Sequence, residues 1–211
     1  MTTDQKVIGG VALISILILA FAVFFMGGST QKSGPVDQSL LVKADSNKIA
    51  SDSAKVTLVE FGDYQCPACG MAAPVIKQIL DEYQGKVGFV FRHFPLPQHS
   101  NAMIAAKAAE AAGEQGKYWQ MHDRLYSAQQ EWENLPNPTE TFVGYAKEFG
   151  MDESAFKASI TTEKFFDKIN GDKNDGNSLG VDSTPTFFVN GIKIRGFAYK
   201  DLKLQIDKAL Q

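Results

Sequence analysis

The two cysteines of this 211-residue chain, Cys66 and Cys69, lie three positions apart in the stretch YQCPACG. Residues three apart on a helix share a face, so their sulfurs come within reach of a disulfide bond without distortion of the chain. Such a pair serves as a structural disulfide, as part of a metal site, or as a redox-active disulfide that passes electrons. The surrounding residues indicate which of these three roles fits the pair best.

Pro67 favours a helix that begins directly after Cys66, because proline is tolerated in the first turn, where its missing N–H has no helical partner. The free N–H groups and partial positive charge of a helix N-terminus favour a thiolate at Cys66. A lowered thiol pKa makes a sulfur a usable nucleophile and a better leaving group near neutral pH. Cys69, one turn further in, is expected to be more buried and to act as the resolving thiol.

The metal and structural alternatives are weaker but stay open. A structural zinc site needs four ligands, and His93, His99 and His122 lack the usual short spacing to one another. We therefore expect no metal, and each histidine is more typical of a packing or surface group than of a catalyst. A structural disulfide would enclose a four-residue ring and stabilise the fold little.

Glu60 stands six residues before Cys66, on the predicted strand face that also carries Val56 and Leu58. A carboxylate on a buried face is costly unless it has a partner or a purpose. One interpretation is that the strand end is solvated there. The other is an acid beneath the thiols, with a pKa raised by desolvation, that accepts a proton from Cys69.

The elements around the pair predict a β-α-β unit. A buried strand is expected at 56–61, a helix at 67–83 and a second strand at 87–96. The cysteines then lie at the carboxyl end of the first strand, where open α/β sheets place their active sites. The apolar residues that helical spacing can place on one face are Met71, Val75, Ile79 and Leu80.

The C-terminal half predicts a helical block inserted into a small α/β domain. Residues 98–180 contain short helical stretches without a convincing strand. Two strands follow around Asn190-Gly191, a strong hairpin signal, and an amphipathic helix closes the chain at 199–210. Pro185 begins the first of these strands, and base rates alone favour its trans form, because only about 5% of X–Pro bonds are cis.

The N-terminal part predicts a membrane anchor and a tether. Residues 1–6 form a short tail, and 7–26 carry no charge and span about 30 Å as a helix, enough to cross a bilayer. An uncleaved anchor is favoured over a signal peptide because the apolar run is long. Residues 27–47 are expected to be a flexible tether with a short strand at 40–42, and 48–211 the folded domain.

Composition argues against a nucleic-acid partner. The chain holds 21 Lys and Arg against 24 Asp and Glu, for a net charge of −3. No dense basic cluster is present, as a nucleic-acid surface would require.

Four stretches together resemble the DsbA-type branch of the thioredoxin superfamily. They are FGDYQCPACG, RHFPLP, GEQGKYWQMHDRLY and GVDSTPTFFVNG. The resemblance covers residues 48–211 and implies a thioredoxin-like α/β fold with an inserted helical domain. One departure concerns Pro67-Ala68, because the archetypal strong oxidase has Pro-His between its cysteines. Alanine supplies no cation, which argues against a very low thiol pKa and a very oxidising potential.

The resemblance also implies site residues. Cys66 corresponds to the attacking cysteine and Cys69 to the resolving one, and Glu60 falls on the family's buried acid position. Pro185 falls on the cis-proline loop, which packs against the disulfide, and Thr184 would offer its backbone groups to an extended substrate peptide. Pro67 and Ala68 would support the cysteines, and no cofactor is needed besides the Cys66–Cys69 disulfide.

We therefore expect a single-pass membrane protein whose extracytoplasmic domain introduces disulfides into secreted or surface proteins that carry free thiols. Reoxidation would come from a membrane quinone-linked oxidase of DsbB or vitamin-K-epoxide-reductase type. Charges around residues 7–26 barely indicate the orientation, but a reducing compartment would discharge an oxidase. Alternatives are a disulfide reductase or isomerase that uses the same pair, and a membrane-tethered module that binds peptides or metal.

Overall fold

The computed structural model describes residues 35–49 and 54–211. The predicted tail at 1–6, the anchor at 7–26 and the first part of the tether lie outside these residues. Across the described ranges, no helix is both long and apolar enough to cross a bilayer.

The described residues build an α/β fold around a five-stranded sheet with the strand order β1-β3-β2-β4-β5. Strands β2 and β3 pair in parallel, whereas β1–β3, β2–β4 and β4–β5 are antiparallel. The strands are β1 (Asn47–Ile49), β2 (Val56–Gly62), β3 (Val87–His93), β4 (Thr186–Val189) and β5 (Ile192–Ile194). The predicted β-α-β unit and the C-terminal hairpin are both confirmed.

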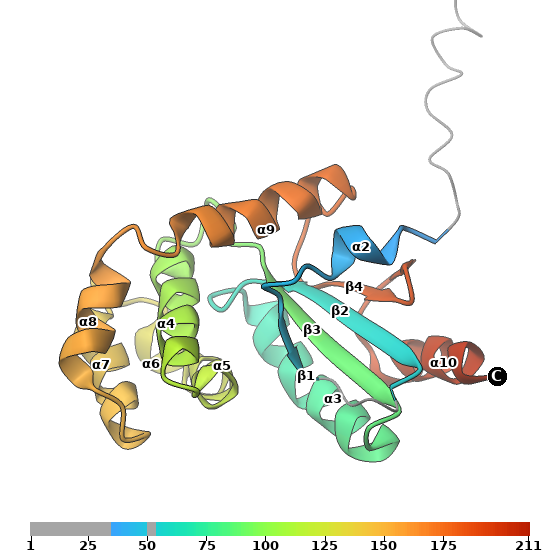
Figure 1. The fold of residues 1–211 in the computed structure, drawn as a ribbon, viewed down its shortest axis with the longest axis horizontal. Helices are drawn as coiled ribbons and strands as arrows, with labels where there is room; N and C mark the ends of the chain where they lie inside the picture. The colour runs from blue at the N-terminus through green and yellow to red at the C-terminus, as the bar shows by residue number, and fades with distance from the viewer. Residues whose placement is uncertain (1–34, 50–53) are drawn as a thin grey trace, which may run out of the picture. The chain divides into compact units, whose positions relative to one another are not determined.

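Helices cover both faces of the sheet (Figure 1). On one face lie α3 (Pro67–Tyr83) and α10 (Tyr199–Leu210), and on the other α2 (Gln38–Leu41) and α9 (Phe166–Ser178). Strand β2 is buried on both faces because its apolar side chains alternate between two separate cores: Leu58 packs in the larger core, and Val59 and Phe61 pack in the smaller one. Period-two alternation puts Glu60 on the Leu58 face, toward α3.

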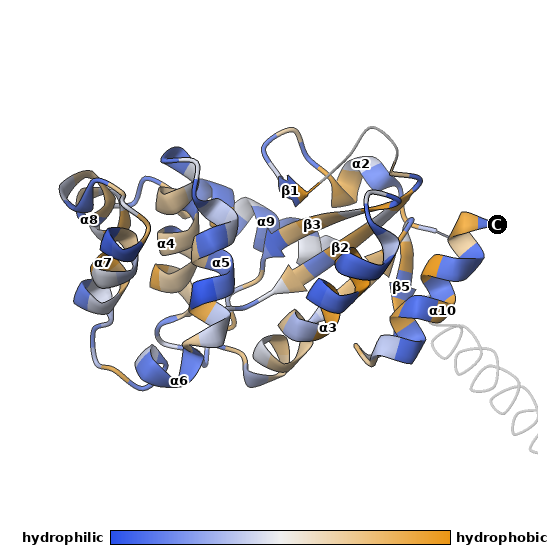
Figure 2. Ribbon diagram, turned by 90° about the horizontal axis from the view of Figure 1, so that it is seen from below, coloured by the Kyte–Doolittle hydropathy of each residue, from blue (hydrophilic) through white to orange (hydrophobic). Residues whose placement is uncertain are grey.

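The remaining helices form most of the insertion predicted at 98–180, whose last helix, α9, packs on the sheet instead. They are α4 (Ala102–Glu114), α5 (Tyr118–Ser127), α6 (Gln129–Trp132), α7 (Thr139–Glu148) and α8 (Glu153–Thr161). Helix α4 is buried over most of its length, since its many alanines allow close packing against its neighbours. Figure 2 shows the resulting helical group beside the sheet, with hydrophobic colour along α4 and hydrophilic colour on the helices around it. An α/β fold with an inserted helical domain is confirmed.

The strand predicted at 40–42 is wrong. Asp37 accepts a hydrogen bond from the N–H of Ser39 and caps the short helix α2 instead. Leu41 is buried against the smaller core, whereas Leu40 is 44% exposed. The folded part also begins earlier than residue 48, because α2 and the first residue of β1 lie inside the segment expected to be a tether.

The predicted buried face of α3 is wrong at Met71, which is 60% exposed. The buried positions are Cys69, Ala72, Ile76, Ile79 and Tyr83. The helix begins at Pro67 and turns Cys69 toward the sheet, so the positions three and four residues further along are the ones that face the core.

In the hairpin, Asn190 and Gly191 take the positive φ values of 45° and 87° that the turn requires.

Candidate active site

Cys66 is the N-cap residue of α3, at the carboxyl end of β2. Its backbone is extended, with φ −72° and ψ 121°, and Pro67 is the first helical residue, as predicted. The Cys66 carbonyl accepts the first helical hydrogen bond from the N–H of Gly70 at 3.1 Å. The thiol therefore lies beside a helix N-terminus, whose N–H groups attract negative charge.

A loop from the other end of the chain covers the Cys66 thiol. The sulfur lies 3.4 Å from the carbonyl oxygen of Thr184, and the Thr184–Pro185 peptide bond is cis, as the resemblance implied. Cys66 is only 7% exposed. The structure thus brings Cys66, Thr184 and Pro185 together, as expected for a loop that presents backbone groups beside the reacting sulfur.

The environment lowers the pKa of the Cys66 thiol to about 5. The largest cause is a hydrogen bond from the Cys69 thiol, against the opposing effect of burial. Hydrogen bonding with Thr184 lowers the pKa further, and the backbone N–H groups of Cys69 and Ala68 contribute less. These donors favour the thiolate without a neighbouring cation. Ala68 therefore supports the thiolate through its backbone, although its side chain supplies no charge.

Cys69 has the opposite character. It is fully buried, and its sulfur accepts a hydrogen bond from the Asp63 N–H at 3.5 Å. Burial raises its pKa well above the ordinary thiol value, and the nearby charges of Glu60 and Cys66 act in the same direction. One thiol is thus ionised near neutral pH and the other holds its proton.

Glu60 lies on the same side of the sheet as the thiols and is 2% exposed. Burial raises its pKa to about 8, and the negative charge of Cys66 adds to the effect. Its Oε1 atom has no hydrogen-bond partner among the described residues. The buried-acid interpretation therefore fits the structure better than a solvated strand end.

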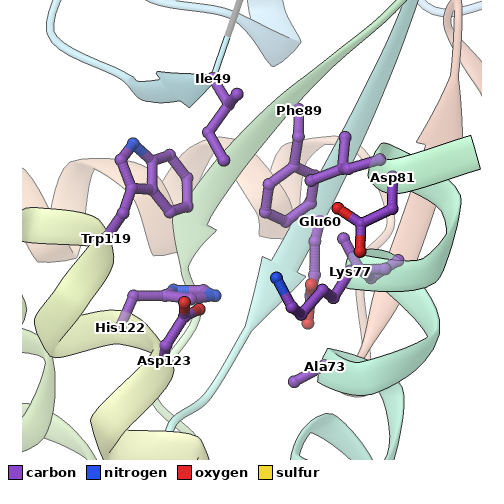
Figure 3. Close-up of a pocket in the computed structure, with 11 residues that line it drawn as sticks. Ile49, Glu60, Ala73, Lys77, Asp81, Phe89, Trp119, His122 and Asp123 are labelled. Carbon is purple, nitrogen blue, oxygen red and sulfur yellow. The ribbon is translucent and has the colours of Figure 1, made fainter. Parts of the chain in front are cut away.

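An open pocket of about 270 Å³ connects the Glu60 region with the surface. Its walls come from α3, α5 and the strands, and Figure 3 shows Lys77 of α3 near Glu60, with Asp123 of α5 on the opposite wall. Water in such a pocket can carry protons between a buried carboxyl and solvent. Glu60 can therefore exchange its proton without contact with a substrate.

Asp63 belongs to the site although the sequence did not single it out. Its buried carboxylate accepts hydrogen bonds from the N–H groups of Gln65 and Leu96, at 2.8 and 2.9 Å, and from His99 Nδ1 at 2.7 Å. This fixes the turn between β2 and Cys66. The available signal was an aspartate directly after a strand, a common turn-forming position.

The histidines pack against other side chains and do not contact the thiols. His93 and His122 are buried, and burial lowers the pKa of His122 to about 3, so its ring is neutral at physiological pH. His93 Nε2 lies 2.7 Å from Glu110, and His122 Nδ1 lies 3.0 Å from the Tyr64 hydroxyl. Over 35–49 and 54–211, no three His, Cys, Asp or Glu side chains are grouped to hold a metal ion.

Comparison with known families agrees with this geometry. A family model described as Thioredoxin matches residues 46–208. Among solved structures, oxidised BdbD from Bacillus subtilis is 26% identical, with a TM-score of 0.73, and covers 84% of this chain and 97% of that one. The alpha-DsbA1 of Wolbachia pipientis is 26% identical, with a TM-score of 0.71, and covers 82% of this chain and 94% of the other.

Curated relatives are longer proteins. Proteins named Na(+)/H(+) antiporter NhaA from Salinispora arenicola and Herminiimonas arsenicoxydans are 36% and 33% identical over 165 and 145 residues. These matches cover 77% and 69% of this chain but 24% and 22% of the relatives. The chain thus spans about a quarter of the length of the curated relatives that it matches, so the likeness concerns one part of them.

Proposed function

The chain belongs to the Thioredoxin family, as a DsbA-like member of the thioredoxin superfamily, and from this premise we propose that it oxidises protein thiols through the Cys66–Cys69 pair. The observation that carries the proposal is the asymmetry of the two thiols. A pKa of about 5 for Cys66 stabilises the reduced form as a thiolate. Whatever stabilises the reduced form makes the disulfide a stronger oxidant.

The proposed reaction has two exchange steps. A substrate thiolate attacks Cys66 in the enzyme disulfide, forms a mixed disulfide and releases Cys69. The Cys69 sulfur takes up a proton because its pKa lies far above neutral, and the nearby Glu60, which is protonated below about pH 8, supplies it. A second substrate thiolate then attacks the substrate sulfur of the mixed disulfide, and Cys66 leaves as a stable thiolate. Two electrons pass from two substrate thiols to the enzyme.

We further propose that the pair is reoxidised by a membrane quinone-linked enzyme of DsbB or vitamin-K-epoxide-reductase type. The proposal places the domain outside the cytoplasm, held to the membrane by residues 7–26. The length and lack of charge of this segment support the anchor. The external side follows from the chemistry, because cytoplasmic thiols would keep the pair reduced.

The direction of electron flow is tested by the reduction potential of the Cys66–Cys69 pair in the full-length chain, equilibrated in glutathione buffers. A value between about −120 and −180 mV, the range of DsbA and protein disulfide isomerase, supports oxidation of substrates. A value near about −270 mV, that of thioredoxin, supports a reductase that uses the same residues. A pair that does not exchange with glutathione contradicts both and leaves a binding module.

A further inference from the structure

A buried amide of the inserted helical domain reaches the active-site turn. Gln129, the first residue of α6, is 8% exposed. Its Nε2 donates to the carbonyl oxygen of Tyr64 at 2.6 Å and to that of Cys66 at 3.0 Å. One side chain from the insertion therefore holds backbone on both sides of Gln65, directly before the reactive helix.

Gly70, the residue after Cys69, provides the space for this amide. A Cβ atom at position 70 would lie 2.9 Å from Gln129 Oε1, closer than carbon and oxygen atoms normally approach. The Gln129 amide thus lies directly against the first turn of α3. Glycine is a poorer helix former than alanine, so close packing gives a reason for glycine at this position.

The Cys66 carbonyl that Gln129 holds is the one that accepts the first helical hydrogen bond, from Gly70. That bond defines the turn whose N–H groups, from Ala68 and Cys69, stabilise the Cys66 thiolate. We propose that Gln129 is a positioning residue for thiol–disulfide exchange. Its amide orients the first turn of α3 toward the Cys66 sulfur, and its packing requires glycine at position 70. The inference rests on the proposed function and extends it to the inserted domain.

The α6 segment has other anchors, one from the turn at Gln65 and one from Asn101 at the start of α4, so Gln129 is not needed simply to attach it. Gln65 Nε2 donates to the Glu133 carbonyl at 2.8 Å, and Asn101 Nδ2 donates to the Leu135 carbonyl at 2.9 Å. Trp132 is fully buried in the same segment. Loss of the Gln129 amide should therefore disturb the turn more than the attachment of α6.

The first test compares Gln129→Ala with Gln130→Ala, a control at the exposed neighbouring position, in the full-length chain. Thiolate absorbance at 240 nm gives the pKa of Cys66, and glutathione equilibration gives the exchange constant. We expect Gln129→Ala to raise the Cys66 pKa and to shift the equilibrium about fivefold toward the disulfide, as loss of one hydrogen bond would. Gln130→Ala should change neither. A folded Gln129→Ala protein with both values unchanged would overturn the proposal.

The second test is a double-mutant cycle between positions 70 and 129, read by urea unfolding. Gly70→Ala should destabilise the parent chain, because the methyl group meets the amide. In the Gln129→Ala background the same change should be neutral or stabilising, because the space is free and alanine favours the helix. Additive effects would disprove the predicted packing. The cycle and the absorbance titration need no exchange activity, so they test Gln129 even where the oxidase proposal fails.

Discussion

The Cys66 sulfur lies 3.4 Å from the Thr184 carbonyl oxygen, although the two residues are 118 positions apart in the chain. The contact joins the N-terminus of α3 to the loop that precedes β4, and β4 pairs directly with β2, the strand that leads to the cysteines. The sheet itself therefore brings the cis-proline loop to the thiol. A peptide that lies along this loop would meet Cys66 first, since Cys69 is fully buried.

The first prediction concerns the acidity of Cys66. Absorbance at 240 nm should reveal one thiolate with a midpoint near pH 5, the value to which its surroundings lower the Cys66 pKa. A depressed pKa stabilises the reduced folded state above the ordinary thiol pKa of about 8.5, and this stabilisation is lost as the pH falls through about 5. The reduced protein should therefore lose stability relative to the oxidised protein between pH 8 and pH 4.5 in urea unfolding.

Cys66→Ala provides the control, because it removes the titrating thiol and keeps Cys69. The midpoint near pH 5 should vanish in this variant. A wild-type midpoint above pH 8 would show that the helix N-terminus does not stabilise the thiolate.

The second prediction separates Glu60 from Cys66. Because the Glu60 pKa is about 8, this carboxyl is uncharged near pH 5, where Cys66 titrates. Glu60→Gln should therefore leave the Cys66 midpoint unchanged. It should slow the attack of Cys69 on a mixed disulfide at Cys66 by about 10², the usual effect of removing a general base. Stopped-flow release of thionitrobenzoate from Cys66 measures this step.

The pH profile of that step gives a further check on Glu60. In the wild type the rate should rise with pH as Glu60 loses its proton and becomes able to accept one from Cys69. This rise should be absent in Glu60→Gln. Asp81→Asn removes another carboxylate that lines the pocket and should retain the wild-type profile. Equal loss in both variants would assign the effect to the general charge of the pocket.

Much of the fold could be predicted because its signals are local. The β-branched run before Gly62, Pro67 after Cys66, and Asn190-Gly191 between two strands each depend on neighbouring residues, and each prediction is confirmed. Errors arose where tertiary contacts decide. Residues 40–42 have apolar side chains that suit a strand, but an Asp37 cap and a core that accepts Leu41 favour a helix.

The site could be predicted only in part for the same reason. The cysteines and Glu60 follow from their spacing along one strand and one helix. Gln129 carries no local signal, because its role depends on carbonyl groups 63 and 65 positions away. Asp63 is intermediate: its place after a strand indicates a turn, but its hydrogen bond with His99 requires the folded chain.

The third prediction concerns His122. Burial lowers its pKa to about 3, so the folded protein resists protonation of this ring. The unfolded chain takes up that proton near pH 6.5, and stability is lost as the pH falls from there toward 3. The loss is about 1.4 kcal/mol per pH unit, an upper value for a buried group. His122→Phe should lack this pH-dependent loss, so the stability of the variant relative to wild type should rise between pH 7 and pH 4 in urea unfolding. A constant difference would show that His122 titrates normally.

The last prediction concerns the buried ion pair between β3 and α9. Arg92 is 1% exposed and donates to Asp172 at 2.7 Å and to the partly exposed Asp175 at 2.6 Å. It also donates to the Leu41 carbonyl at 2.9 Å, so it holds α2 as well. Arg92→Met would leave the Asp172 carboxylate buried without its cation. We expect a cost of about 3 to 5 kcal/mol in urea unfolding, as for other broken buried pairs.

Two companion variants identify the cause of that cost. Asp172→Asn added to Arg92→Met removes the unpaired charge and should restore part of the lost stability, because an amide is less costly to bury than a carboxylate. Lys43→Met removes a cation, 38% exposed, that lies 3.6 Å from Asp175, the outer carboxylate that Arg92 also binds. Exposed pairs of this kind contribute about 1 kcal/mol or less. If Arg92→Met lowers the free energy of unfolding no more than Lys43→Met does, the Arg92–Asp172 pair does not hold α2 and α9 on the sheet. A large cost that Asp172→Asn relieves would instead assign it to the buried charge.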